Sequence, residues 1–203
     1  MSQLYIDTGN VVKDKQDREA YLLKQNKDIA IGFIDLEKVN ETSDKEHYLI
    51  CSYKDPDKLG ETYQHKALKY FDLVAGIFAT KIEQLFKNGY QNVYLVTDHG
   101  FVLTGILDNS DKIEVDFKGN VKISERFIRS ENKQKIDTNL LIEKEVVYNN
   151  FNYSYFAKRL GPFKSTGVYG FSHGGLSPQE TIIPFLKWSN DNNAQDQLQV
   201  VIS

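Results

Sequence analysis

Two histidine-containing motifs supply residue types that metal chemistry needs. In the first, Asp98 and His99 directly follow an apolar segment and precede Gly100. A carboxylate oxygen and an imidazole nitrogen are both good ligands for Zn²⁺ or Mn²⁺, and a glycine lets the backbone turn away from a bound ion. The alternative is a capped turn in which Asp98 accepts backbone hydrogen bonds. For an isolated Asp-His-Gly sequence, the capped turn is the commoner explanation.

The second motif is His173 with the two glycines after it, in a glycine-rich stretch ahead of a predicted short helix. A histidine here is a candidate metal ligand, and the glycine backbone is able to approach a phosphate closely. The alternative is a histidine in a flexible surface loop. Ser177, Pro178 and Glu180 predict the start of the helix, because they combine a cap, a first-turn proline and a glutamate three residues after the cap.

Two carboxylates and two guanidinium groups are further candidates. Asp55 and Asp57 follow an apolar run, and carboxylates at a strand end can ligate a divalent ion. Asp-Pro-Asp is equally well explained by ordinary turn chemistry. Arg126 and Arg129 carry guanidinium groups that can bind phosphate oxygens in a fork. Arginines on a surface strand are the commoner explanation for that pair.

Strands and a long helix must position these side chains. Apolar runs predict three buried strands, at residues 29–34, 48–51 and 92–97. Apolar residues spaced by three and four from Ala67 to Phe86 predict a helix, and Gly89 suits its left-handed end. Because ligands bind beyond the carboxyl ends of strands in α/β sheets, Asp98 and His99 lie where such a fold places a site.

Shorter segments complete the predicted organisation. They are a charged helix over 14–24, a turn over 53–60, a β-hairpin with strands at 113–117 and 121–123, a loop over 161–175, and terminal strands over 185–188 and 197–202. Residues 127–155 have mixed character and yield no assignment. A helix, a glycine stop and a buried strand in succession indicate an α/β fold.

Composition narrows the classes of protein. The chain has 203 residues, 40% hydrophobic residues and a net charge of −3, which fits one domain, or two small ones, with a real core. The acidic balance argues against a charge-driven grip on nucleic acid without excluding a local basic groove. The single Cys51 excludes an internal disulfide and suits a reducing compartment. Without a secretory signal or a membrane-length apolar run, we expect a soluble cytoplasmic protein that does not bind membranes.

The order of these motifs resembles that of the PglZ domain, a branch of the alkaline phosphatase superfamily. A hydrophobic strand leads into Val-Thr-Asp-His-Gly at 96–100, and the longer, more specific motif at 170–184 reads GFSHGGLSPQETIIP. Upstream, residues 55–60 resemble the superfamily's middle Asp-containing segment. The resemblance covers roughly residues 29–188. We therefore divide the chain into a polar segment, 1–28, and the C-terminal portion of a PglZ-like domain, 29–203.

The resemblance implies a fold and a cofactor. The fold would be an alkaline-phosphatase-like α/β sheet with flanking helices and a β-hairpin insertion, incomplete in this chain. The cofactor would be two divalent metals, usually zinc, which clamp the attacking and leaving oxygens of a phosphoryl displacement. By position, Asp98 and His99 would hold one metal. His173 and one of Asp55 or Asp57 would hold the other.

The resemblance also implies an activity and a setting. The activity would be that of a phosphatase or phosphodiesterase on a phosphoester, by analogy a nucleotide-derived one, alongside other proteins of BREX-type phage defence. The superfamily's Thr or Ser nucleophile, expected shortly after a metal-binding Asp at the end of the first strand, has no match here. We therefore expect little or no hydrolase activity from this chain alone. The alternative is a non-catalytic interaction module that docks onto other defence proteins.

Overall fold

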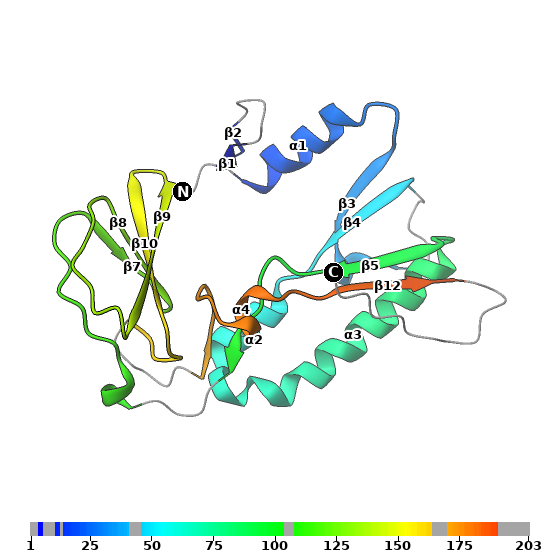
Figure 1. Ribbon diagram of the computed structural model, residues 1–203. Coiled ribbons are helices and arrows are strands. Elements are labelled where there is room, and N and C mark those ends of the chain that lie inside the picture. Colours follow the sequence, from blue (N-terminus) through cyan, green and yellow to red (C-terminus); the bar gives the residue numbers. More distant parts are fainter. Residues whose placement is uncertain are drawn as a thin grey trace. The chain divides into compact units, whose positions relative to one another are not determined.

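The computed structural model describes residues 4–5, 11–12, 14–40, 46–103, 108–163 and 170–190 (Figure 1). The chain divides into two compact units. The first unit comprises Met1–Lys54, Ala75–Val93 and Trp188–Leu198, and the second comprises Asp55–Val74, Tyr94–Lys187 and Gln199–Ser203. The predicted boundary between residues 28 and 29 stays a prediction.

Helices and short sheets alternate along the chain, which confirms the α/β class. The α-helices are α1 (Lys15–Gln25), α2 (Asp55–Tyr63), α3 (Leu68–Lys87) and α4 (Pro178–Thr181), and the 3-10 helices are Leu36–Lys38, Gln64–Ala67 and Asn109–Asp111. The strands are β1 (Leu4–Tyr5), β2 (Val11–Val12), β3 (Ile31–Asp35), β4 (Tyr48–Ser52), β5 (Asn92–Val96), β6 (Val102–Leu103), β7 (Val121–Ile123), β8 (Phe127–Ser130), β9 (Leu141–Tyr148), β10 (Phe151–Ala157), β11 (Phe171–Ser172) and β12 (Phe185–Ser189).

The first unit contains a parallel strand pair and most of α3. Strands β3 and β4 pair in parallel from Ile31 with Tyr48 to Asp35 with Ser52, so two of the predicted strands are confirmed. The core of this unit is made by Leu36, Val39 and Leu85. The Lys81 ammonium on α3 donates to the carbonyls of Glu37 and Val39 at 2.9 and 2.6 Å, which ties α3 to the segment after β3.

The two predicted helices of this region, α1 and α3, are confirmed. Local signals explain where α1 begins and where α3 ends. The carboxylate of Asp14 accepts a hydrogen bond from the backbone N–H of Asp17 at 2.9 Å, which caps α1. Helix α3 ends at Lys87, and Gly89 adopts a φ of +89°. That left-handed conformation is the one that a glycine accepts without steric cost.

The prediction of a turn over residues 53–60 is wrong, because α2 begins at Asp55. A proline in the first turn of a helix loses no hydrogen bond, since the first N–H groups have no partner within the helix. The carboxylates of Asp55 and Asp57 also interact favourably with the positive end of the helix dipole. A side chain at Gly60 would clash with the ring of Phe171. This glycine therefore serves close packing within a helix and does not mark a turn.

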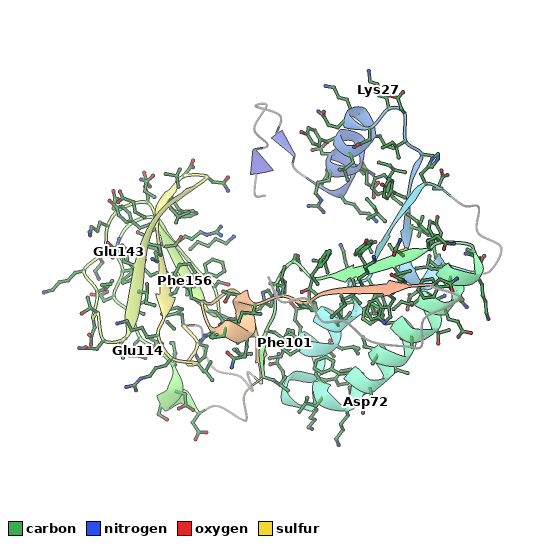
Figure 2. The ribbon with its side chains drawn as sticks, turned by 45° about the vertical axis from the view of Figure 1, so that its right-hand side comes forward. Lys27, Asp72, Phe101, Glu114, Glu143 and Phe156 are labelled. Atoms are coloured by element: carbon green, nitrogen blue, oxygen red, sulfur yellow. The ribbon has the colours of Figure 1, made fainter. Side chains whose placement is uncertain are left out.

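The second unit contains an antiparallel sheet in the order β7-β8-β10-β9. Figure 2 labels Glu143 on β9 and Phe156 on β10 of this sheet. Five buried residues form its core: Ile128, Leu141, Tyr155, Ala157 and Phe163. Strands β8 and β9 and most of β10 lie within residues 127–155, to which the sequence assigned no structure.

The predicted β-hairpin is half wrong, because β7 pairs with β8 and residues 113–117 form no strand. The backbone N–H of Ile113 donates to the carbonyl of Pro162 at 2.8 Å. The amide side chain of Gln134 accepts from the N–H of Lys118 and donates to its carbonyl, both at 2.9 Å. The backbone of Ile113 in the predicted strand, and that of Lys118 just after it, therefore pair outside the predicted hairpin.

Two short strand pairs lie close in sequence to the two histidine motifs. Strand β11 pairs antiparallel with β6, and β12 pairs with β5. The predicted strand at 185–188 is confirmed by β12, whereas the one at 197–202 lies outside the described residues. Among the helices described, none has the length and apolar character needed to cross a membrane.

Candidate metal centre

The pairing of β6 with β11 brings the two histidine motifs together in the second unit. Phe171 lies opposite Leu103, and Ser172 lies opposite Val102. Extending this antiparallel register places His173 near the residues that follow His99. The rings of Phe101 and Phe171 pack with centroids 4.7 Å apart, which holds the two short strands together beneath the histidines.

The two imidazoles are stacked. The ring centroids of His99 and His173 lie 4.2 Å apart, with an interplanar angle of 11°. The motifs that the sequence singled out separately are therefore neighbours in the folded chain. This contact is the central geometric fact of the candidate site.

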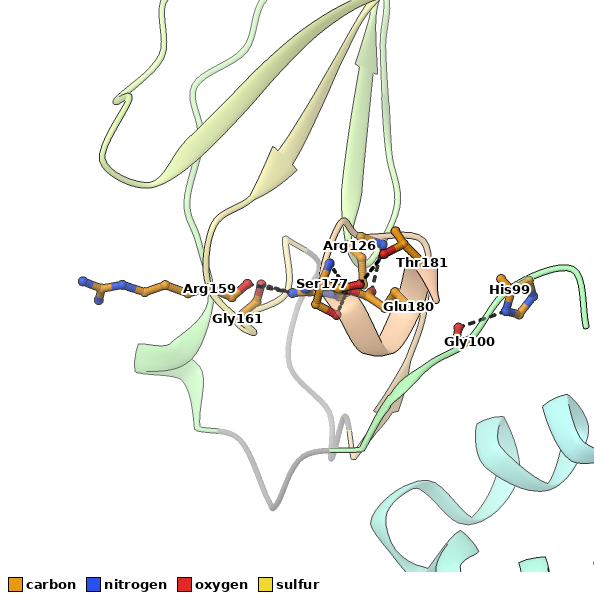
Figure 3. Close-up of polar contacts among 9 residues, drawn as sticks. His99, Gly100, Arg126, Arg159, Gly161, Ser177, Glu180 and Thr181 are labelled. Carbon is orange, nitrogen blue, oxygen red and sulfur yellow. Dashed lines mark hydrogen bonds and ion pairs between the residues drawn. The ribbon is translucent and has the colours of Figure 1, made fainter. Parts of the chain in front are cut away.

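His99 is held in a conformation that suits a metal ligand. Its Nδ1 lies 3.1 Å from the carbonyl oxygen of Gly100 (Figure 3). When Nδ1 carries the proton and donates it to that carbonyl, Nε2 keeps a free lone pair, as metal-binding histidines require. Nε2 faces two carboxylates, with Asp57 Oδ2 and Asp98 Oδ1 each 3.8 Å away.

The structure distinguishes the two aspartates of α2. Asp57 faces His99, whereas Asp55 Oδ1 lies 3.3 Å from the ammonium of Lys58 one turn along the same helix. The sequence left open which of the two belongs to the site. The geometry brings Asp57, and not Asp55, into contact with the histidine motifs.

The donors fit a divalent ion in type and in pairwise spacing. Imidazole and carboxylate are ligands that zinc and manganese accept. Two atoms bound to one zinc ion at ~2.0–2.2 Å each lie at most about 4.4 Å apart, and both 3.8 Å separations at His99 Nε2 satisfy this limit. Within the described ranges, no three His, Cys, Asp or Glu side chains are grouped to hold an ion. The geometry therefore shows donor pairs around His99 and not a full coordination shell.

Arg126, a phosphate ligand expected from the sequence, is buried and paired with a carboxylate. Its side chain is 1% exposed and forms a bidentate pair with the Glu180 carboxylate, at 3.0 Å from Nε and 3.1 Å from Nη2. Its Nη1 donates to the carbonyls of Arg159 and Gly161. The guanidinium thus donates to acceptors of the protein itself, and a phosphate-binding role of Arg126 stays a prediction. Arg129 lies 4.9 Å from the Phe127 ring centroid, and its phosphate-binding role stays a prediction.

Glu180 has contacts that the sequence did not predict. The capping-box pattern predicted a bond to Ser177, and Glu180 Oε2 accepts from the hydroxyl of Ser177 at 2.7 Å. The carboxylate also accepts from the Gly175 N–H at 2.8 Å and from Arg126. Burial acts to raise the pKa of Glu180, but the hydrogen bonds from Arg126 and Ser177 and the charge of Arg126 outweigh it and lower the pKa. Glu180 is therefore ionised at neutral pH.

Comparisons with known proteins agree with the motifs. A family model described as the BREX system PglZ alkaline phosphatase-like domain matches residues 5–188, so the match also includes most of the segment that we set apart as 1–28. The "Alkaline phosphatase-like protein PglZ" of Bacillus cereus (strain H3081.97) is 24% identical over 199 residues, which are 91% of this chain and 23% of that protein. The chain thus spans less than a quarter of this relative's length. No solved structure matches. The expected resemblance is confirmed: the chain belongs to the PglZ family of alkaline phosphatase-like domains.

Proposed function

We propose that the chain supplies metal ligands to a metal-dependent phosphoric-ester hydrolase, a phosphatase or phosphodiesterase of the PglZ type. One observation carries the proposal: His99 Nε2 faces Asp57 and Asp98 while its ring stacks on His173. Membership of an alkaline phosphatase-like family supports the hydrolase class. The geometry supports a cation-binding role for these residues.

Each side chain has a distinct task in this proposal. Asp98 and His99 bind one divalent ion, zinc in the first instance, and Asp57 and His173 bind a second. When bound, such ions act as Lewis acids that stabilise charge on phosphoryl oxygens. The Gly100 carbonyl fixes the tautomer of His99. The charges of Asp57 and Asp98 favour a cation beside His99 and repel a phosphoester anion that arrives without one.

The setting of the activity follows from the family. We propose a phosphoester substrate, nucleotide-derived by analogy, and a role in BREX-type phage defence together with other defence proteins. A cytoplasmic location accords with this role and with the single Cys51.

Zinc binding by the purified chain tests the proposal. Isothermal titration with Zn²⁺, and with Mn²⁺ in parallel, is carried out on the wild type and on the variants His99→Ala and His173→Ala. We expect each variant to lose at least about tenfold in affinity, since each removes a ligand. His47→Ala is the matched control, because His47 lies in the first unit, where its Nδ1 accepts from the Ala30 N–H at 3.4 Å. Equal affinity in all four proteins would contradict the proposal.

An exposed apolar patch favours a second candidate, a non-catalytic interaction module. Tyr94 and Val96 on β5 and Phe185 on β12 are each more than half exposed, and the rings of Tyr94 and Phe185 lie 5.7 Å apart. Exposed aromatic side chains that pack on one another in this way are candidates for an interaction surface. Plaque assays in a host that carries the defence system separate the candidates. Protection lost in Tyr94→Ser/Phe185→Ser but kept in His99→Ala/His173→Ala would establish the interaction module and exclude the hydrolase.

A further inference from the structure

We propose that Glu180, held by Arg126, is a positioning residue that fixes both histidine motifs of the candidate metal centre. The inference rests on the proposed function, because the site that Glu180 serves is the one proposed above. It assigns to Glu180 a task that exceeds the capping of a four-residue helix.

The side chain of Glu180 holds the loop that carries His173. One carboxylate oxygen, Oε1, accepts from the Gly175 N–H at 2.8 Å and from Arg126 Nε at 3.0 Å. The other, Oε2, accepts from the Ser177 hydroxyl at 2.7 Å and from Arg126 Nη2 at 3.1 Å. Glu180 is only 4% exposed, so water does not compete for these bonds. Gly175 lies two residues from His173, and its backbone is thereby fixed.

The backbone of Glu180 holds the other motif. Its carbonyl accepts from the Gly100 N–H at 3.0 Å, and the Gly100 carbonyl in turn lies 3.1 Å from His99 Nδ1. A side chain at Gly100 would clash with the carbonyl oxygen of Gln179, so this approach of α4 requires glycine. One residue therefore contacts the His173 loop through its carboxylate and the His99 turn through its carbonyl.

Arg126 fixes the direction of the carboxylate. Its Nη1 donates to the carbonyls of Arg159 and Gly161 at 3.0 and 3.1 Å, while Nε and Nη2 hold Glu180 (Figure 3). A planar guanidinium bound on both edges leaves the carboxylate little rotational freedom. Buried ion pairs often add less stability than apolar residues of the same size. A gain in stability is therefore a weak explanation for the presence of the Arg126–Glu180 pair. Orientation of the two histidine motifs explains it sufficiently.

The test uses Glu180→Gln, which keeps the side-chain shape and removes the charge. Two readouts are taken: the through-space NMR contact between the imidazole rings of His99 and His173 without metal, and Zn²⁺ affinity by calorimetry. We expect the ring contact to be lost and the affinity to fall about 10–100-fold, the usual effect of removing support behind a metal ligand. Circular dichroism confirms that the helices persist.

The matched control is Glu143→Gln in the same unit. Glu143 Oε1 also pairs with a cation, at 2.9 Å from Lys133 Nζ, but it contacts neither histidine motif in the described structure. This variant keeps both the ring contact and the wild-type zinc affinity if the proposal is correct. Loss of the ring contact in the control as well would overturn the proposal, since the contact would then report general loosening.

The outcomes separate this inference from the proposed function. A ring contact that persists in Glu180→Gln overturns the positioning role, whatever the zinc result. A wild type that shows the contact but binds no zinc, together with loss of the contact in the variant, supports the positioning role and contradicts the proposed function. If Glu180→Gln does not fold, Glu180→Asp decides, because it keeps the charge beside Arg126 but shortens the side chain that reaches the Gly175 N–H. Loss of the contact there supports the inference, and its retention overturns it.

Discussion

Two ion pairs of the second unit, Arg126–Glu180 and Lys133–Glu143, differ in burial and in the segments that they connect. Arg126 and Glu180 have side chains that are 1% exposed and meet through two parallel contacts. The side chains of Lys133 and Glu143 are 67% and 22% exposed, with one contact between Lys133 Nζ and Glu143 Oε1. The first pair joins α4 to loops far apart in sequence, whereas the second joins the edge strand β9 to a nearby loop.

The difference shows that an ion pair holds neighbouring segments in fixed positions only when it is buried. In water, the attraction between charges is weakened by the high dielectric constant, and long side chains remain free to move. Without water, each unsatisfied hydrogen-bonding group costs free energy, so all partners must be in place together. The Arg126–Glu180 pair can therefore transmit order to the histidines, and the Lys133–Glu143 pair cannot.

The largest effect is expected from breaking the buried pair on one side. Arg126→Met leaves the Glu180 carboxylate buried without its cation, so the free energy of unfolding falls by about 3–5 kcal/mol. Urea denaturation of the whole chain measures it. The double variant Arg126→Met/Glu180→Leu restores most of the loss, because no uncompensated charge remains. A double variant whose loss equals the sum of the two single losses would show that the two side chains act independently, and it would contradict the predicted coupling.

A smaller effect is expected where α4 approaches the His99 turn. Gly100→Ala places a methyl group against the Gln179 carbonyl oxygen, which costs about 1–3 kcal/mol of unfolding free energy and weakens zinc binding. The matched control is Gly76→Ala on α3, where an added methyl group meets open space. That variant gains roughly 0.5–1 kcal/mol, because alanine favours a helix over glycine. Equal stability of the two variants would contradict the close packing.

A pH series sharpens the comparison further. The folded pKa of Glu180 lies below its ordinary value of 4.5, so its stabilising effect is fully present above pH 4.5 and is lost as the pH falls through the lower folded pKa. Urea midpoints of wild type and Glu180→Gln therefore differ at pH 7 and converge in acid. A difference that stays constant down to the lowest pH at which both proteins fold would contradict the ionised state of Glu180.

The smallest effect is expected at the exposed pair. Lys133→Met shifts the urea midpoint less than any variant above, because solvent screens the charges. The hydrogen bond from Lys133 to Glu143 raises the pKa of Lys133, so the lysine stays charged at neutral pH and the comparison is valid. Repeating the measurement in about 1 M salt should abolish the shift. A salt-resistant loss as large as that of Arg126→Met would remove the contrast between the two pairs.

Much of the fold was predictable where local patterns decide it. Helix α3, β4, β5 and the capping box at Ser177 follow from periodicity and end signals that act over a few residues. The errors arose where tertiary contacts prevailed. Residues 113–117 alternate as a strand would, but the N–H of Ile113 donates to the carbonyl of Pro162 and not to a neighbouring strand.

The sequence identified the candidate site's histidines, but it did not predict the contacts that hold them in place. His99 and His173 stand out by type, and the family resemblance indicated that they meet. Local sequence could not choose Asp57 over Asp55, because a side chain in a predicted turn has no defined direction until α2 is recognised. Local sequence also could not predict the pair of Glu180 and Arg126. The two residues are 54 positions apart, and no motif contains both.

Anomalous X-ray diffraction from crystals of the zinc-loaded chain tests the central claim most directly. If the two histidine motifs form a metal centre, a zinc peak will lie ~2.0–2.2 Å from His99 Nε2, beside Asp57 or Asp98 and next to the His173 ring. A zinc ion bound only elsewhere, at His47 for example, with His99 and His173 turned apart, would contradict it.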